Sequence, residues 1–186
     1  NLMGIVVEPV TMGIVSTKFK SEGALLITHW GMSGPATLKL SAHAARYLQE
    51  QNYRVNVAIN WVNESNANIV EEHIANIIQR NPKKHIAGIA PYQLTNRMWQ
   101  YLLERADIDG TKRWDELGRK GLNKLIETLT NDIHATQGKG RFKDEFVTCG
   151  GISLQSVDSS TLESKVCPNL YFAGELLDID GITGGF

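Results

Sequence analysis

The sequence has little cysteine, no long apolar run and almost no net charge. Two cysteines, Cys149 and Cys167, among 186 residues exclude a disulfide scaffold and, without histidine ligands, a four-thiolate zinc site. Apolar runs such as Ala24–Ile27 are far too short to span a bilayer, and no signal-peptide pattern is present. A net charge of −1 argues against a protein that coats polyanions or binds membranes through basic residues. These absences predict a cytoplasmic globular protein with no membrane partner.

Charge is distributed unevenly along the chain. Residues 1–65 carry five basic and four acidic side chains, residues 66–143 thirteen and nine, and residues 144–186 one and seven. These shifts indicate separate structural units, and the length allows one domain or two small lobes. Because the sequence starts at Asn1 and stops within a glycine-rich stretch, we expect a fragment of a longer protein.

The first third of the sequence is typical of strands with one helix. Pro35 suits a first helical turn, and Ser33 or Gly34 can cap the helix that follows, through about Glu50. The triplet Ser21-Glu22-Gly23 is typical of a turn. Strands are predicted, from β-branched content or alternation, at Gly4–Val10, Thr11–Phe19, Ala24–Thr28 and Arg54–Val62.

The middle of the sequence is helical, and strand patterns return after it. Apolar residues at helical spacing predict three helices, around Ile69–Ile78, Leu94–Leu102 and Leu117–Leu129. Strands are predicted at Ile133–Thr136, Phe142–Val147 and Leu170–Ala173. Strands, a helical block and strands again predict an α+β fold with a helical insert.

The most informative stretch is the C-terminal one, in which the strand Leu170–Ala173 runs into Gly174 and Glu175. Ligands of open α/β sheets bind at the carboxyl ends of strands, and glycine lets a ligand approach the backbone closely. A carboxylate there can accept hydrogen bonds from sugar or ribityl hydroxyls, and free N–H groups of later glycines can bind phosphate. Spacing alone favours the simpler interpretation, a strand followed by a tight acidic loop.

Three long stretches of the sequence also resemble a known protein family. Tyr171–Phe186 (YFAGELLDIDGITGGF), Glu22–Ser41 and Phe146–Glu175 resemble, in order and spacing, a family of bacterial FAD-dependent oxidoreductases of the aminoacetone-oxidase-like or bile-acid-reductase-like kind. The resemblance implies a Rossmann-like, two-lobe flavoprotein whose FAD domain is interrupted by a small β-barrel-like lobe with an inserted helical subdomain. The G-x-G-x-x-G fingerprint is missing, because Gly138-Lys139-Gly140 has no third glycine. We therefore expect one wall of an FAD site, without a complete site.

The resemblance also implies a division of the chain. Residues 1–65 and 137–165 would form the β-rich lobe, residues 66–136 the helical insert, and residues 166–186 a strand and a glycine-rich turn that return to the FAD-binding domain. The cofactor-facing residues that it implies fall into two groups. Near the flavin or the substrate pocket it places Thr148, Gly150 and Gly151. Along the ribityl chain, the phosphates and the ring it places Gly174, Glu175, Asp178, Asp180, Gly181, Ile182, Gly184 and Gly185.

The sequence does not identify the catalytic residues. His29 is a candidate proton donor and Ser33 a candidate substrate ligand, although backbone pairing and helix capping explain them as well or better. Cys149 and Cys167 are interpreted as incidental thiols. No metal site is predicted, because Asp178–Gly181 lacks the other positions of a calcium loop and the histidines are scattered.

The parent protein is therefore predicted to be an FAD-dependent oxidoreductase, with FAD and a small-molecule substrate as its partners. The alternative is a non-enzymatic module that binds protein or nucleic acid through the helical subdomain. Residues 80–120 carry nine basic and five acidic side chains with four interspersed aromatic residues. Because the charges are mixed, a solvated face is the favoured interpretation, and nucleic acid is not expected as a partner. The substrate, the electron acceptor and the oligomeric state do not follow from the sequence.

Overall fold

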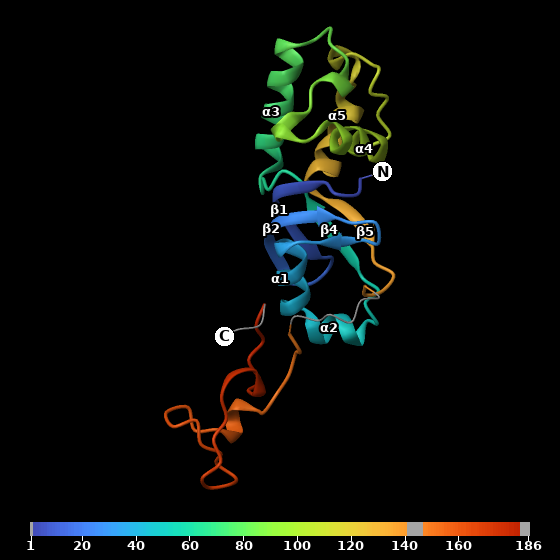
Figure 1. Ribbon diagram of the computed structural model, residues 1–186. Helices are drawn as coiled ribbons and strands as arrows, with labels where there is room; N and C mark the ends of the chain where they lie inside the picture. Colours follow the sequence, from blue (N-terminus) through green and yellow to red (C-terminus); the bar gives the residue numbers. More distant parts are fainter. Residues whose placement is uncertain (1, 141–146, 183–186) are drawn as a thin grey trace.

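The computed structural model describes residues 2–140 and 147–182. A β-sheet lies in the middle, a helical subdomain with α3, α4 and α5 lies at one end, and the C-terminal segment 147–182 extends at the other (Figure 1). Among these described residues, no helix combines the length and apolar character needed to cross a bilayer. The α+β fold, with its barrel-like sheet and its helical subdomain, is as predicted.

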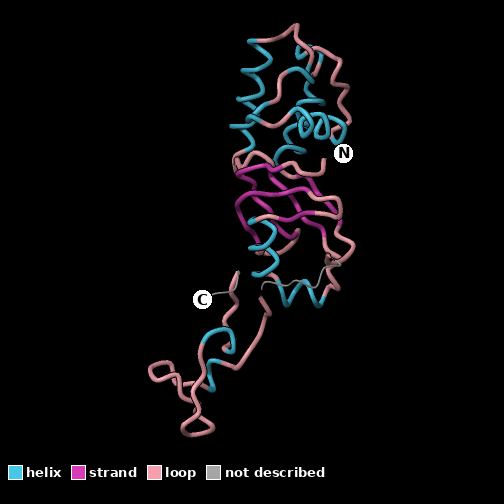
Figure 2. Tube along the Cα trace, in the orientation of Figure 1, coloured by secondary structure: helices cyan, strands magenta, loops and turns pink. Residues whose placement is uncertain are grey.

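The sheet has five strands in the order β3-β2-β1-β4-β5, and all neighbours are antiparallel. The strands, magenta in Figure 2, gather in the middle of the molecule. In the register, Thr11 of β1 faces Asn60 of β4, and Val57 of β4 faces His134 of β5. The strands are β1 (Val6–Ile14), β2 (Lys20–Ile27), β3 (Met32–Ser33), β4 (Asn56–Asn60) and β5 (Asp132–Ala135).

The first hairpin differs from the prediction. One strand, β1, replaces the two predicted at Gly4–Val10 and Thr11–Phe19, and Pro9 sits where its register against β2 shifts, between Val7 and Val10. A proline that lacks the ladder N–H is tolerated at such an irregularity. The turn lies before β2, with Ser16 at a φ of 63°, and the expected turn Ser21–Gly23 is part of β2. The turn was misplaced because small polar residues also occur inside strands.

One face of the sheet is covered by α1 (Pro35–His43). The inward residues of β1, Val10, Met12 and Ile14, are buried against it, and the hydroxyl of Ser21 donates to the carbonyl of Ala36 at 2.7 Å. The predicted helix to Glu50 is divided at Ala44 into α1 and α2 (Ala45–Glu50).

Gly34, and not Ser33, precedes the first turn of α1, and no side chain caps this helix. Gly34 has a φ of 93°, and a Cβ there would lie 2.8 Å from the carbonyl oxygen of Ala24. Close packing of helix on strand therefore requires glycine at this position.

The helical subdomain follows the predicted periodicity. α3 (Ala67–Arg80) is capped by the Asn66 side chain, and α4 (Asn96–Arg105) by Thr95. α5 (Gly118–Thr130) returns to the sheet at β5. Short 3-10 turns connect these helices at Ile86–Gly88, Pro91–Gln93 and Trp114–Glu116. At the centre, the fully buried indoles of Trp99 and Trp114 stack with ring centroids 6.2 Å apart.

A buried carboxylate joins the sheet to the helical subdomain. Asp132, at the start of β5, accepts hydrogen bonds from Trp61 Nε1 at 3.0 Å, Arg105 Nη2 at 2.6 Å and His134 Nε2 at 2.7 Å. Burial alone would raise the pKa of this carboxyl, but the three donors outweigh it and hold the pKa below its usual value. Since Arg105 ends α4 and Trp61 follows β4, this cluster fixes the angle between the helical subdomain and the sheet.

The C-terminal segment 147–182 has turns and single bridges. Its pairings are Val157 with Ser164, Glu163 with Tyr171 and, in parallel, Ile152 with Leu177. The predicted strand Leu170–Ala173 is therefore wrong for this structure, because only Tyr171 pairs and no described strand lies beside it to form a ladder. Of the predicted strand Phe142–Val147, all but Val147 lies outside the described residues. Several large apolar side chains of the segment are exposed, namely Leu154, Leu162, Val166, Leu170, Tyr171, Leu176 and Ile179.

Candidate functional site

The two groups of predicted cofactor-facing residues come together in the C-terminal segment. The backbone N–H of Ile152 donates to the carbonyl of Leu176 at 2.8 Å, and the N–H of Asp178 donates to the carbonyl of Ile152 at 3.0 Å. Residues 150–152 therefore run parallel to residues 176–178, although some 25 residues separate them in the sequence. Leu177, buried at this crossing, gives it a small apolar centre.

Gly151 makes the crossing possible. A Cβ at this position would lie 2.6 Å from both the carbonyl carbon and the carbonyl oxygen of Leu177. These are backbone atoms, which cannot rotate away as the end of a side chain can. Any larger residue would therefore push the two segments apart.

Acidic side chains cluster beside the crossing and meet one arginine from the barrel-like lobe. Arg46 of α2 forms an ion pair with Asp178 at 2.6 Å, and this carboxylate raises the guanidinium pKa. Asp180 Oδ1 accepts a long hydrogen bond from the N–H of Gly150 at 3.4 Å. Burial, followed by hydrogen bonding to Asp180, raises the pKa of the Cys149 thiol. This thiol is thus kept protonated, which does not suit a nucleophile.

Gly150 and Gly174 leave open backbone beside this crossing. Gly150 has a φ of 102° and Gly174 a φ of 67°, and no atom lies within 4 Å of where their Cβ atoms would be. Glu175, next to Gly174 in the 3-10 turn Gly174–Leu176, has an exposed side chain. Glycines with open space in the left-handed region let a ligand approach the backbone closely, and an exposed carboxylate can accept hydrogen bonds from hydroxyl groups. These residues are compatible with the ribityl side of an FAD site.

The structure ties the remaining predicted residues less closely to the crossing. Thr148 is exposed, and Gly181 and Ile182 follow the acidic turn as half-buried residues. Gly184 and Gly185 lie outside the described residues. His29 is exposed and lies edge-on to Trp30, with ring centroids 6.5 Å apart. Within residues 2–140 and 147–182, no hydrogen bond or ion pair joins His29 or Ser33 to the C-terminal segment, so neither is brought to the crossing.

Arg46 is the residue of this site that sequence reasoning missed. It lies on the short helix α2, just after the stretch Glu22–Ser41 and outside every quoted motif. Nothing in its spacing distinguishes it from a solvated surface arginine, and only the fold brings it to Asp178.

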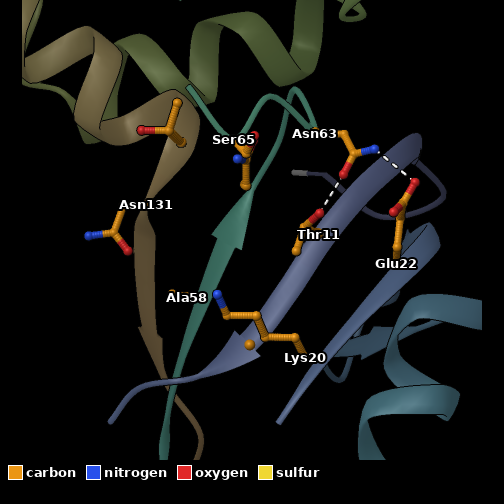
Figure 3. Close-up of a pocket in the computed structure, with 10 residues that line it drawn as sticks. Thr11, Lys20, Glu22, Ala58, Asn63, Ser65 and Asn131 are labelled. Carbon is orange, nitrogen blue, oxygen red and sulfur yellow. Dashed lines mark hydrogen bonds between the residues drawn. The ribbon is translucent and has the colours of Figure 1, made fainter. Parts of the chain in front are cut away.

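A hollow separate from the crossing lies on the uncovered face of the sheet, with a volume of about 500 Å³. Most of the residues that line it are polar, and among them Asn63 accepts a hydrogen bond from Thr11 and donates one to Glu22 at 2.8 Å (Figure 3). Lys20, Ser65 and Asn131 also line it. The hollow suits a polar group, and it has no contact with the crossing of the C-terminal segment. Within the part of the chain that the structure describes, no cluster of histidine, cysteine and carboxylate side chains could hold a metal ion.

Comparison with known proteins adds independent information on this architecture. Residues 1–147 match the family described as "HI0933-like protein barrel and H2TH domain". The whole chain is 28% identical to the ribosomal RNA dihydrouridine synthase of Escherichia coli K12, and it covers 43% of that protein. Over 90% of the chain it is 29% identical to the 3-dehydro-bile acid delta(4,6)-reductase of Clostridium scindens, covering 41% of it. Over 87% it is 30% identical to the ribosomal RNA dihydrouridine synthase of Haemophilus influenzae, covering 38%. The chain thus spans about two fifths of each of these relatives.

Proposed function

This chain belongs to the HI0933-like family, and from that premise we propose that it is the insert of an FAD-dependent reductase. In this proposal, residues 1–65 and 137–165 form the β-rich lobe, residues 66–136 the helical insert, and residues 166–186 the return to the FAD-binding domain. The insert covers the flavin and shapes the substrate pocket, and the remainder of the FAD site belongs to the rest of the parent protein.

The observation that carries this proposal is the crossing of residues 150–152 with residues 176–178. It brings the segment that contains Gly150 beside the segment that follows Gly174 and Glu175, and each of the two glycines has open space where a side chain would be. In the bound state FAD supplies the two-electron chemistry, and the protein supplies binding and orientation. Glu175 accepts hydrogen bonds from the ribityl hydroxyls, and Arg46 holds the acidic turn in place through Asp178. The exposed Leu176 and Ile179 pack against the FAD-binding domain, which explains their exposure in this chain.

The relatives suggest the class of reaction. One kind is named for producing dihydrouridine and the other is named a delta(4,6)-reductase. Both names describe the addition of hydrogen to an unsaturated substrate, so we assign the same class of reaction to the parent of this chain. Such a reduction adds a hydride and a proton across a double bond. Reduced FAD would supply the hydride to such a reduction, and the proton would come from solvent or from an acidic side chain.

Replacement of Glu175 tests the proposal. The Glu175→Ala protein, made from the complete reading frame and purified without added cofactor, is expected to retain several-fold less FAD than the unchanged protein, because the ribityl hydroxyls lose their acceptor. The measurement is the ratio of flavin absorbance to protein absorbance after desalting.

The matched control is Glu72→Ala, which removes an exposed carboxylate from α3 in the helical subdomain. Its flavin content is expected to equal that of the unchanged protein. Unchanged flavin content in the Glu175→Ala protein would contradict the assignment of this residue.

A further inference from the structure

Two loops of the helical subdomain are tied together into a ribbon that presents basic side chains. The N–H of Ile86 donates to the carbonyl of Lys112 at 2.9 Å, and the N–H of Trp114 donates to the carbonyl of Lys84 at 3.1 Å. His85 and Arg113 form an antiparallel bridge between these bonds. We call residues 82–86 and 112–115 the basic ribbon. Because two of its own side chains, Ile86 and Trp114, are fully buried in the core, the ribbon is held rigidly on it.

The basic ribbon carries more positive charge than its internal salt bridge neutralises. It contains four lysine and arginine residues and one carboxylate, Asp115, and that carboxylate pairs with Lys83 at 2.8 Å. Lys84, Lys112 and Arg113 are exposed. They form no salt bridge with any residue of the described ranges 2–140 and 147–182, although Asp109 and Asp115 lie close enough to be influenced by Lys112 and Arg113.

The flanking helix ends extend the same charge. Arg80 ends α3, and Arg119 and Lys120 occupy the first turn of α5, where Arg119 pairs with Glu71 of α3. Lys120 opposes the helix dipole in that turn, so helix stability does not explain its position. Over residues 80–86 and 111–120 together there are seven basic and two acidic side chains. This excess is the signature of a surface that meets a polyanion.

The position of the basic ribbon indicates the size of the partner. The ribbon lies at the end of the molecule opposite the C-terminal segment, with the sheet and α3 between them (Figure 1). α3 has 14 residues, which alone is about 21 Å at a rise of about 1.5 Å per residue. A small ligand at the flavin wall cannot reach so far, whereas a folded nucleic acid can.

We propose that the basic ribbon binds the phosphate backbone of an RNA partner. The inference rests on the proposed function, since it makes RNA the substrate class of the reductase, and it is supported by the ribosomal RNA named for two of the relatives. It reverses the interpretation of this block as a solvated mixed-charge face, because the loop pairing gathers cations that the sequence order intersperses with acids. The ribbon positions the RNA and takes no part in the reduction.

The test is RNA binding by fluorescence anisotropy, using protein from the complete reading frame and a fluorescein-labelled RNA stem–loop. The variant Lys84→Gln/Lys112→Gln/Arg113→Gln is expected to raise Kd about tenfold or more at ~0.1 M KCl. The slope of log K against log [KCl] is expected to fall by about two to three, because each lost phosphate contact removes nearly one released counterion. The control variant Lys18→Gln/Lys39→Gln/Arg54→Gln removes the same charge from the barrel-like lobe and is expected to leave both values almost unchanged.

Three results would overturn the proposal: no RNA binding by the unchanged protein, equal weakening in both triple variants, or displacement of the RNA by poly-glutamate at equal charge concentration. Circular dichroism of each variant checks that the fold is intact. Flavin content is measured on the same samples and separates the two proposals. Flavin without ribbon-dependent RNA binding would contradict only the RNA partner, and ribbon-dependent RNA binding without flavin would contradict only the proposed function.

Discussion

Replacing Asp132 with alanine is expected to lower the free energy of unfolding by about 3 kcal/mol, since it leaves buried donors without their acceptor. The carboxylate side chain is only 3% exposed, while its partner Arg105 is 41% exposed. Arg105 can therefore turn to water, but the N–H of Trp61 cannot, because that indole is buried. The measurement is urea denaturation at pH 7, followed by circular dichroism and tryptophan fluorescence.

The pH dependence of this effect follows from the lowered pKa of Asp132. A carboxyl with a pKa lower in the folded than in the unfolded state stabilises the fold above the unfolded value of about 3.9. That stabilisation is lost as the pH falls through the folded value. The difference between the unchanged and the Asp132→Ala protein should therefore shrink when the titration is repeated below about pH 4.

Asp107→Asn is the matched control, because Asp107 also accepts a hydrogen bond from a cation, Lys124, at 3.0 Å, but is exposed, and asparagine tolerates its φ of 55°. Exposed ion pairs of this kind contribute little to stability. The free energy of unfolding of the control variant at pH 7 should therefore differ only slightly from that of the unchanged protein. Equal losses in both variants would contradict the role of Asp132 as the joint between sheet and helices.

Replacing Trp99 with alanine is expected to lower the free energy of unfolding by about 4 kcal/mol, more than the Asp132 replacement does. The helical subdomain is expected to unfold first. Its side chain is fully buried against Trp114, and its Nε1 donates to the carbonyl of Ile86 at 2.9 Å. That carbonyl belongs to the basic ribbon, so the loss reaches the surface proposed for RNA. Denaturation of the variant should show a separate early transition in α-helical circular dichroism.

Two further variants separate the contributions of Trp99. Trp99→Phe keeps most of the packing but removes the hydrogen bond to Ile86, and it should cost about 1 to 2 kcal/mol. Trp30→Ala removes an indole that is 48% exposed, and it should cost much less than Trp99→Ala. A Trp99→Ala protein as stable as the Trp30→Ala protein would contradict the packing account of the subdomain.

The helices were the most predictable part of the fold. The spacing of Ile69, Ile74 and Ile77 locates α3 within a few residues, although Ile69 itself is exposed and Val70 and Ile74 form the buried face. The hairpin of β1 and β2 was less predictable, because a proline at a register shift and a serine at positive φ contradict local preferences that the sheet overrides. The apolar pattern of the sequence does not predict the division of the helix at Ala44.

The site was predictable only as far as motifs reach. The resemblance to flavoproteins is confirmed by the family match and by the relatives, and the structure joins residues 150–152 to residues 176–178 as neighbours. Arg46 and the basic ribbon could not be predicted, because both arise from contacts between residues distant in the sequence. In the ribbon, residues near 84 meet residues near 113, and no periodicity records such a pairing.

The central claim is that this chain supplies one wall of a flavin site in a reductase. The most direct test is the visible absorption spectrum of protein made from the complete reading frame, purified without added cofactor and desalted. We predict a flavin band that survives desalting and changes on reduction. A colourless protein that also fails to gain the band after incubation with FAD would contradict the account.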